Sequence, residues 1–304
     1  MNINKLHTFL TLAECLNFTE TADKLYCSQP AVSMQIQSLE DDLGTPLFDR
    51  IGKKLFLTSH GKLFKPYAEQ MVNLLQQAKE HLKQSESLST GTLSFGSSNF
   101  VGVYLLPAVL SSFNKRYPGI HINMNITSSQ QLIYMLETNK LEFLVLSDHI
   151  KVDETLFHSS TFYRDELVLI APSSHPAAGK KDCSVLDFSN ETLLLKPQKS
   201  ATRSFLDTMF SQFGVTFNRF MEISNLEAIK QAVIHGLGIS VVSKFAVQHE
   251  IASGLLIEIP LRDAAFRRGI QYVHYKNKHL SPAATQFIHM LDNVDAHLIS
   301  AKTP

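Results

Sequence analysis

The residues from 28 to 37 combine small and amide side chains at helical spacing. At about 100° per residue, Pro30, Ser33, Met34 and Gln37 point away from the apolar side of the predicted helix. Glutamine can bond adenine bidentately, serine can donate to a base or a phosphate, and proline or methionine can touch a thymine methyl group. The predicted DNA contacts in this region are Ser28, Gln29, Pro30, Ser33, Met34 and Gln37, and Thr19 is added from the preceding helix. The residues alone also fit a three-helix bundle with an ordinary polar face.

A basic hairpin is predicted directly after this helix. Residues 47–50 and 55–58 have the composition of two short strands, with a tip at residues 52–53. A hairpin with a basic tip after a helix-turn-helix is a wing, whose cations meet the phosphate backbone or the minor groove. The cations predicted to do so are Arg50, Lys53 and Lys54.

Three later segments are rich in hydroxyl and amide groups where helices are expected to begin. They are residues 97–99, 127–130 and 200–203. Free N–H groups of a first helical turn, the helix dipole and a fixed guanidinium all favour an anion. The alternative is that these residues are only helix caps. The predicted anion-binding residues are Ser97, Ser98, Asn99, Thr127, Ser129, Thr202 and Arg203.

Three short helices must position the first set of side chains. One apolar face recurs at i, i+3, i+4 and i+7 through Leu6, Phe9, Leu10 and Ala13. We expect Thr19 to cap the second helix, with Ala22 and Leu25 inward, and Ser28 to cap the third. The third helix has an apolar stripe and ends at Gly44. That stripe consists of Val32, Ile36, Leu39 and Leu43.

A long amphipathic helix is predicted from Thr58 to Ser85, about 40 Å at 1.5 Å per residue. Its apolar residues alternate three and four apart, as in a coiled coil. A second subunit is the expected partner, and packing on its own chain is the alternative. The predicted dimerisation residues are Phe64, Tyr67, Met71, Leu74, Leu75, Ala78 and Leu82. The small and polar residues 85–91 are expected to form a hinge.

From Thr92 onward the pattern alternates between strands and helices. This alternation predicts an α/β fold with mostly parallel sheets, in which ligands bind beyond the carboxyl ends of strands.

Composition limits the remaining possibilities. The 304 residues have zero formal net charge, but the segment 45–83 holds seven basic and three acidic residues, a local +4. The three cysteines, Cys15, Cys27 and Cys183, are not at metal-site spacing, which fits a reduced cytoplasmic protein. Cys27 could act as a redox switch, although a small packed residue is the preferred interpretation. No leader sequence or membrane span is expected.

The head and the carboxy-terminal part both resemble the LysR-type transcriptional regulators. The head matches through Phe18-Thr19, Ala22, Leu25, Ser28-Gln29-Pro30-Ala31-Val32-Ser33, Gln35-Ile36, Leu39-Glu40, Leu43-Gly44, Leu47-Phe48, Arg50, Leu57-Thr58 and Gly61. The rest matches through Tyr104-Leu105-Leu106-Pro107, Tyr117-Pro118, Ala171-Pro172, Glu227-Ala228-Ile229-Lys230 and Gly236-Leu237-Gly238-Ile239-Ser240. Thr21 departs from the family pattern, as do Met34 and Gln37, which stand where basic residues are common. Because the last two remove expected phosphate or guanine contacts, the operator sequence and salt dependence do not carry over from the family.

The resemblance implies a winged helix-turn-helix head over 1–58, a linker helix and hinge over 59–90, and a periplasmic-binding-protein-like effector domain over 91–304. This domain would have two lobes, 91–162 with 266–304 and 163–265, with crossovers near Phe162 and Ala265. Family ligand residues carry over best to Ser98, Asn99, Ser129 and Thr202. Glu142 stands where the family usually has aspartate, which suggests a structural role.

We therefore expect a dimeric or tetrameric regulator that binds an inverted repeat of double-stranded DNA, responds to a small anionic effector and acts with RNA polymerase. No cofactor, metal site or membrane partner is expected. An enzyme is disfavoured, because no metal motif, dinucleotide loop or nucleophile elbow occurs. A solute-binding transport protein is disfavoured by the winged head. The chain leaves open the effector, the operator and whether the effect is activation or repression.

Overall fold

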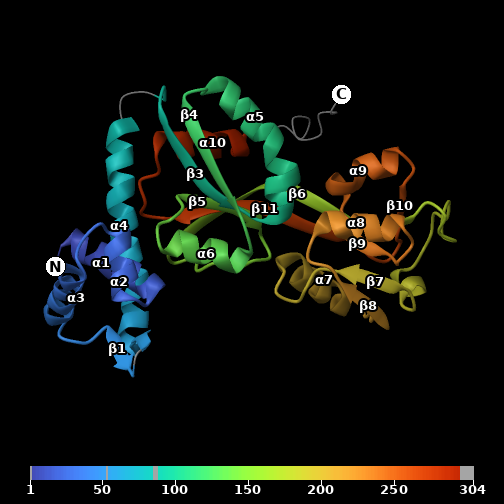
Figure 1. Ribbon diagram of the computed structural model, residues 1–304. Coiled ribbons are helices and arrows are strands. Elements are labelled where there is room, and N and C mark those ends of the chain that lie inside the picture. Colours follow the sequence, from blue (N-terminus) through green and yellow to red (C-terminus); the bar gives the residue numbers. More distant parts are fainter. Residues whose placement is uncertain (1, 53, 85–87, 295–304) are drawn as a thin grey trace. The chain divides into compact units, whose positions relative to one another are not determined.

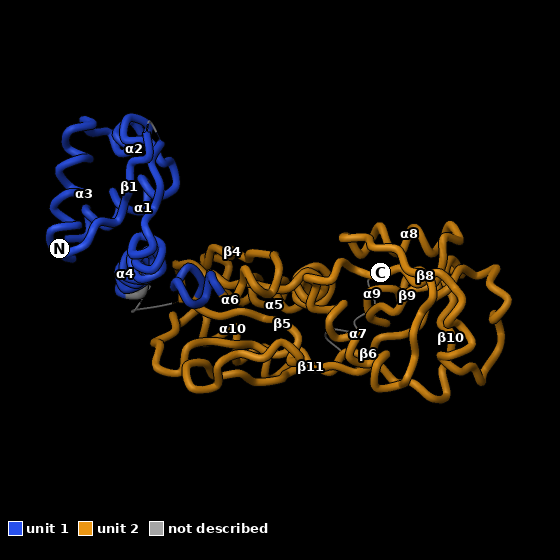
Figure 2. The backbone as a smooth tube through the Cα atoms, turned by 90° about the horizontal axis from the view of Figure 1, so that it is seen from below, with its two compact units in different colours: residues 1–87, 134–141 blue, residues 88–133, 142–304 orange. Residues whose placement is uncertain are grey.

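The computed structural model describes residues 2–52, 54–84 and 88–294. It divides into two compact units, which Figure 2 shows in different colours. Unit 1 comprises residues 1–87 and 134–141, and unit 2 comprises residues 88–133 and 142–304. Three of the predicted hinge residues, 85–87, lie outside the described residues.

Unit 1 begins with three short helices, α1 (Ile3–Cys15), α2 (Phe18–Lys24) and α3 (Gln29–Leu43) (Figure 1). Their apolar faces meet in one core, in which Phe9, Leu12, Val32 and Leu39 are fully buried. The Ser28 hydroxyl accepts the Ala31 N–H at 3.4 Å, which confirms the predicted cap of α3. Gly44 ends this helix with a φ of 67°, a left-handed conformation that glycine adopts without strain.

Two predictions about this head were wrong. The cap of α2 is Asn17 rather than Thr19, because the Asn17 side chain accepts the N–H groups of Thr19 and Glu20. Leu43 is 36% exposed, since it lies in the last turn of α3 beyond the reach of the core. Thr21, one of the departures from the family pattern, is fully buried and donates its hydroxyl to the Asn17 carbonyl at 2.8 Å.

The hairpin follows as β1 (Phe48–Ile51) and β2 (Lys54–Leu57), and helix α4 then runs over Ser59–Gln84. Ile51 pairs with Lys54, which confirms the predicted hairpin, and Gly52 follows β1 at its tip. Lys53 itself lies outside the described residues. Cys27, for which a packed position was preferred, is exposed.

Unit 2 contains strands and helices in alternation. Its strands are β3 (Gly91–Ser97), β4 (Ile120–Ile126), β5 (Phe143–Ser147), β6 (Phe157–Pro172), β7 (Thr192–Leu195), β8 (Arg219–Glu222), β9 (Ser240–Ser243), β10 (Leu256–Ile259) and β11 (Phe266–Tyr275). Its helices are the π-helix η1 (Val101–Leu105), α5 (Leu106–Arg116), α6 (Ser129–Glu137), η2 (Val185–Phe188), α7 (Ala201–Gln212), α8 (Leu226–Ile234), α9 (Lys244–Ala252) and α10 (Pro282–Asp292). Helix α6 ends in the residues assigned to unit 1.

Within the described residues, seven strands form one sheet in the order β10-β6-β11-β5-β3-β4, with β9 also paired to β6. Strand β3 is parallel to β4 and β5, whereas β6 and β11 are antiparallel to each other and to their other neighbours. The expectation of mostly parallel sheets was therefore wrong for this sheet. Antiparallel pairing arises because the chain passes from lobe I to lobe II along β6 and returns along β11.

The two long strands carry the crossovers between the lobes. Their register becomes irregular where Ile270 pairs with Tyr163 and Gln271 with Thr161, which leaves Phe162 as the extra residue. Phe266 packs against Phe210 of α7, with ring centroids 5.6 Å apart. The return passage therefore lies inside β11, a few residues beyond the predicted Ala265.

Aromatic packing fixes the helices of lobe I on the sheet. Phe95 and Phe143 stack with centroids 4.9 Å apart, and Phe287 of α10 lies 5.1 Å from Phe95. Buried Glu142 accepts the Ser281 N–H at 2.7 Å and the Ser281 hydroxyl at 3.0 Å. The carboxylate thus holds the start of α10, which agrees with the structural role predicted for Glu142.

Candidate functional site

Helix α3 has the two faces that its sequence predicts. Val32, Ile36 and Leu39 are buried, and the opposite side is exposed to solvent. The exposed side chains include every contact residue predicted on this helix and its cap, namely Ser28, Gln29, Pro30, Ser33, Met34 and Gln37. Thr19 is also exposed, in the first turn of α2. Their roles in DNA binding stay predictions.

Gln35 and Gln37 differ in their environment although both lie on α3. Gln35 is half-buried and accepts a hydrogen bond from the Thr8 hydroxyl at 2.5 Å, so its side chain takes part in packing within the head. Gln37 is exposed and donates to Asp41 one turn later at 3.0 Å. A base edge would therefore have to displace the Asp41 carboxylate from Gln37.

The hairpin is joined to α3 by a carboxylate. Glu40 accepts the backbone N–H groups of Leu47 and Phe48 at 2.7 and 3.1 Å. Arg50 and Lys54 are exposed, and the Arg50 guanidinium carbon lies 4.9 Å from the centroid of the Phe18 ring. The predicted wing cations that the structure describes are thus solvent-accessible on β1 and β2.

The apolar stripe of α4 divides into two parts. Phe64 and Met71 pack against the core of their own head, beside the fully buried Ala68. The own-chain alternative therefore accounts for this part of the stripe. The part that stays exposed consists of Tyr67, Leu74, Leu75, Ala78 and Leu82.

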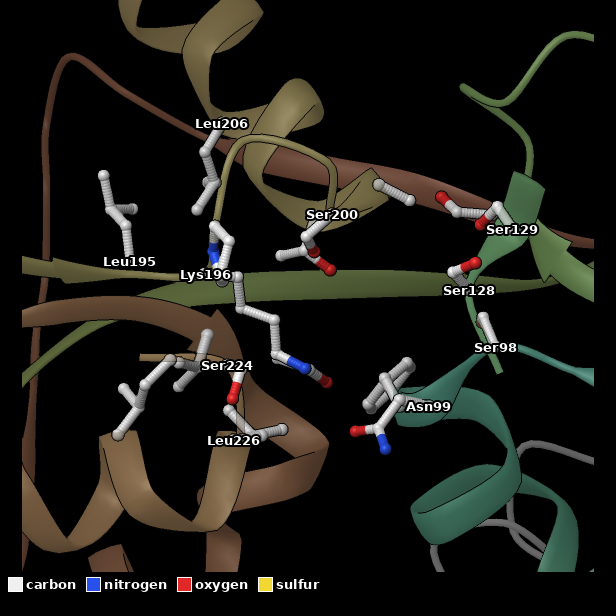
Figure 3. Close-up of a pocket in the computed structure, with 18 of the residues that line it drawn as sticks. Ser98, Asn99, Ser128, Ser129, Leu195, Lys196, Ser200, Leu206, Ser224 and Leu226 are labelled. Atoms are coloured by element: carbon white, nitrogen blue, oxygen red, sulfur yellow. The ribbon is translucent and has the colours of Figure 1, made fainter. Parts of the chain in front are cut away.

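Unit 2 encloses a cavity of about 390 Å³. Its polar residues follow the carboxyl ends of strands, as expected for an α/β fold. Ser98 and Thr127 follow β3 and β4, whereas Lys196 and Ser224 follow β7 and β8. Figure 3 shows Ser98, Asn99, Ser128 and Ser129 on one wall, facing Lys196 and Ser200 on the other. The apolar part of the lining lies on the same side as Lys196 (Figure 3) and includes Leu194, Leu195, Leu206, Leu226 and Ile229.

Most of the predicted anion-binding residues meet in this cavity. Its lining includes Ser98, Asn99, Thr127, Ser129 and Thr202. Ser97 does not belong to it, because it is the last residue of β3, is fully buried and donates its hydroxyl to the Ser98 carbonyl at 3.1 Å.

Arg203 also lies outside the cavity lining, against the prediction that it supplies the guanidinium. Its side chain is bound to Asp207 at 2.8 Å and Glu222 at 3.3 Å, and it also donates to the Lys196 carbonyl. Asp207 lies one turn further along α7, so the helix itself provides the acid that captures this cation.

Arg268 on β11 supplies the guanidinium of the cavity instead. It is 7% exposed, lies within 2.8–2.9 Å of Asp165 and donates to the Thr202 hydroxyl at 3.1 Å. Asp165 therefore balances its charge. No local sequence signal identified Arg268, because its partner is 103 residues away in the chain.

Lys196 is the second cation that the sequence interpretation missed. It is half-buried and lines the cavity, and within the described residues its ammonium group has no hydrogen-bond or ion-pair partner. Burial and, second, the charge of Arg268 lower the pKa of Lys196. Lys196 directly follows the buried run Leu193–Leu195, so the rule that ligands lie beyond strand ends could have found it.

His149 connects the two walls beside the cavity. Its Nε2 lies 2.6 Å from the Ala201 carbonyl at the start of α7, and its Nδ1 lies 2.8 Å from the Ser147 hydroxyl. A carbonyl only accepts, so Nε2 carries the proton and Nδ1 accepts from Ser147. Burial lowers the pKa of His149.

A second connection between the lobes joins η1 to α8. The Tyr104 hydroxyl donates to the Glu227 carboxylate, and burial followed by this carboxylate raises the pKa of Tyr104. Lys230, only 4% exposed, contacts Glu227 at 3.0 Å and Glu250 at 2.6 Å. The Lys230 ammonium also lies 5.4 Å from the Tyr104 ring centroid.

Comparison with known proteins matches both parts of the chain to known domain families. Residues 3–62 match the model of the bacterial regulatory helix-turn-helix protein, lysR family, and residues 86–296 match that of the LysR substrate binding domain. The RuBisCO operon transcriptional regulator of Allochromatium vinosum is 32% identical over 287 residues, which cover 94% of each protein.

Two solved structures are similar as well. Full-length CbnR complexed with its target DNA has a TM-score of 0.71 at 20% identity and covers 96% of this chain and 99% of its own. The regulatory domain of Synechocystis CcmR in complex with 2-PG has a TM-score of 0.61 at 26% identity, covering 66% of this chain and 96% of its own.

The relatives are transcriptional regulators rather than enzymes, and a solute-binding transport protein is not favoured. Among the helices of the described residues, none is both long and apolar enough to span a membrane. The chain therefore belongs to the LysR family of DNA-binding transcriptional regulators, with an amino-terminal helix-turn-helix and a carboxy-terminal effector-binding domain.

Proposed function

We propose that this regulator binds an inverted-repeat promoter site as a dimer or tetramer and changes that binding when a small organic anion enters its cavity. The observation that carries the DNA part is the exposed polar face of α3 beside a basic hairpin. Two-fold pairing of such helices matches a repeat whose halves lie one or more helical turns apart.

The dimer part of the proposal is supported by α4. Tyr67 and Leu74 are 56% and 54% exposed, and Leu82 is 77% exposed. A seam of large apolar side chains at coiled-coil spacing gains free energy when a second α4 covers it. We infer that these residues form the dimer contact, while Phe64 and Met71 brace α4 against its own head.

The effector part is carried by one observation in the cavity, the Lys196 ammonium, which has no partner among the residues that the structure describes. Ser200 precedes α7 and makes no capping hydrogen bond with its side chain, so its hydroxyl is available beside the free N–H groups of that helix. Because Asp165 balances Arg268, the charge offered to a ligand comes from Lys196 and from Lys199 at the lining. The apolar residues of the lining suit a carbon-containing anion.

An effector of this kind would act through the lobes. It regulates only if it binds one arrangement of the two lobes more tightly than another, so that the DNA-bound population changes. We propose that this change alters contact with RNA polymerase in the cytoplasm, where the promoter lies.

The test of the effector is a thermal-shift screen of carboxylates, phosphates and sulfates, with 2-PG included because the similar CcmR domain binds it. A ligand at 100 times its dissociation constant adds about 2.7 kcal/mol of stability. We expect one or more anions to raise the melting temperature of the wild type. Lys196→Met should lose this response, because the ammonium that holds the anion is gone.

Lys180→Met provides the matched control, since Lys180 is an exposed lysine of lobe II outside the cavity lining. This variant should respond like the wild type. An equal response of Lys196→Met and Lys180→Met would place the anion elsewhere. A screen without any stabilising anion would contradict the proposed ligand class.

A further inference from the structure

A second hollow, of about 290 Å³, lies in the head between α3 and the hairpin. Helix α3 contributes Ser33 and Gln37 to its lining, and the hairpin contributes Phe48, Arg50 and Leu55. Phe18 of α2 completes this wall. The hollow therefore joins the polar face of the recognition helix to the basic strand of the wing.

Arg50 is the cation of this hollow. It is exposed, and within the described residues it makes no hydrogen bond or ion pair with protein. Its guanidinium carbon lies 4.9 Å from the centroid of the Phe18 ring, which is a cation–π contact. An aromatic face holds a guanidinium in place while its N–H donors remain available at the edge.

Phe18 is itself held firmly. It is half-buried and packs against the core of the head, so its position follows from that core. The hairpin is fixed on the other side by Glu40, whose Oε1 accepts the N–H groups of Leu47 and Phe48. Glu40 is the acidic residue of the lining, and these two donors occupy its Oε1. The cation thus stays at a set place relative to Ser33.

The geometry of DNA indicates which part of the duplex would lie over the hollow. A helix in the major groove and a hairpin at the neighbouring minor groove lie on either side of one sugar-phosphate strand. We propose that the hollow seats a single backbone phosphate, bound by the Arg50 guanidinium and the Ser33 hydroxyl, and that Phe18 is the residue that positions Arg50. This inference rests on the DNA binding proposed above and adds the phosphate site and the positioning residue.

The experiment measures the affinity of the full-length protein for a fluorescent random-sequence duplex of about 30 base pairs at several salt concentrations. Each phosphate contact contributes about 0.9 to the slope of log affinity against log salt. Arg50→Ala should therefore flatten the slope by about 0.9 per protomer, or about 1.8 in a dimer. Phe18→Leu should flatten it similarly, although it removes no charge, because the guanidinium loses its support.

Two further variants separate positioning from packing. Phe18→Tyr keeps an aromatic face and should retain the wild-type slope. Phe18→Leu in the Arg50→Ala background should cause no further flattening. Lys5→Ala removes one cation from the head as well, but Lys5 is bound to Asp42 and Ser38, so the slope should not change. Thermal melting shows that each variant is folded at the temperature of the assay.

The outcomes distinguish the inference from the function on which it rests. If the wild type binds no duplex at any salt concentration, the proposed DNA binding fails. If the wild type binds and Phe18→Leu keeps its slope, Phe18 only packs the core and the positioning role is overturned. If Arg50→Ala keeps the slope, the hollow holds no phosphate.

Discussion

His149 is a single residue that contacts both walls of the cavity. Its ring is neutral when Nε2 donates to the Ala201 carbonyl and Nδ1 accepts from Ser147. The Ser147 hydroxyl also lies 3.3 Å from the Gly269 carbonyl, to which it can donate, so its oxygen could accept an N–H from a protonated ring and this contact does not select the neutral form. Burial of the ring is what favours its neutral form.

This preference predicts a pH dependence of stability. Burial lowers the pKa of His149 in the folded state below its ordinary value of 6.5, so the unfolded chain binds the proton first as the pH falls. The free energy of unfolding contributed by His149 is fully present above pH 6.5 and is lost between this value and the lowered pKa. His149→Gln keeps a donor for Ala201, so its melting temperature should fall less than that of the wild type between pH 7.5 and pH 5.

His121→Gln serves as the control, because His121 is exposed on β4. Its melting temperature should follow the pH as in the wild type. A decline for His149→Gln that matches the wild type would show that the ring does not resist protonation.

The contrast between Arg203 and Arg268 explains what could be predicted for the cavity. Strand ends are visible in the sequence, and so the hydroxyl groups of Ser98, Thr127 and Ser129 were placed well. Arg203 was chosen because it stands at a helix start, but Asp207 captures it within the same helix. Arg268 could not be predicted, because its place in the cavity depends on pairing with Asp165 on the neighbouring strand, and no local sequence pattern encodes that pairing.

At the scale of elements, local chemistry determines the head. Ser28, Gly44 and the two-residue hairpin tip were predictable, because caps and turns depend on neighbouring residues. Helix α4 was harder, since one part of its stripe packs on its own head and another part is exposed, and periodicity does not say which residues belong to which part. The same limit applies to β6 and β11, whose antiparallel pairing depends on the path of the whole chain.

The divided stripe of α4 predicts an effect on assembly. Leu74→Glu places a charge in the exposed part of the seam, so it should weaken the dimer while leaving the head folded. Light scattering after size-exclusion chromatography should shift from roughly twice the chain mass of 34.1 kDa towards that mass. Lys79→Glu, at an exposed polar position of the same helix, should leave the mass unchanged. A dimer that withstands Leu74→Glu would argue for a different interface.

At the scale of the whole effector domain, Tyr104 joins lobe I to lobe II. Tyr104→Phe keeps the ring beside Lys230 but removes the hydroxyl that donates to Glu227. A hydrogen bond to a charged group that is partly solvated contributes about 1 kcal/mol. This loss corresponds to a fall of about 2–4 °C in the melting temperature of a domain of this size.

Tyr117→Phe is the appropriate comparison for Tyr104→Phe. Within the described part of the chain, the Tyr117 hydroxyl donates to Gln286 alone, at 3.4 Å, and both residues belong to lobe I. Its removal should change the melting temperature by less than a degree or so, since a long neutral hydrogen bond contributes little. Equal shifts for the two variants would mean that the connection between the lobes adds no stability.

The position of β11 in the sheet also has a consequence for biosynthesis. Strand β5 ends at Ser147, but the synthesis of its neighbour β11 is complete only when the chain has reached Tyr275. At roughly 5–20 residues per second, the edge of β5 stays uncovered for on the order of ten seconds. The head and much of lobe II are complete before this edge is closed. In nascent chains the unpaired edge of β5 therefore leaves lobe I open to aggregation and chaperone binding, although the first part of this lobe is synthesised before lobe II.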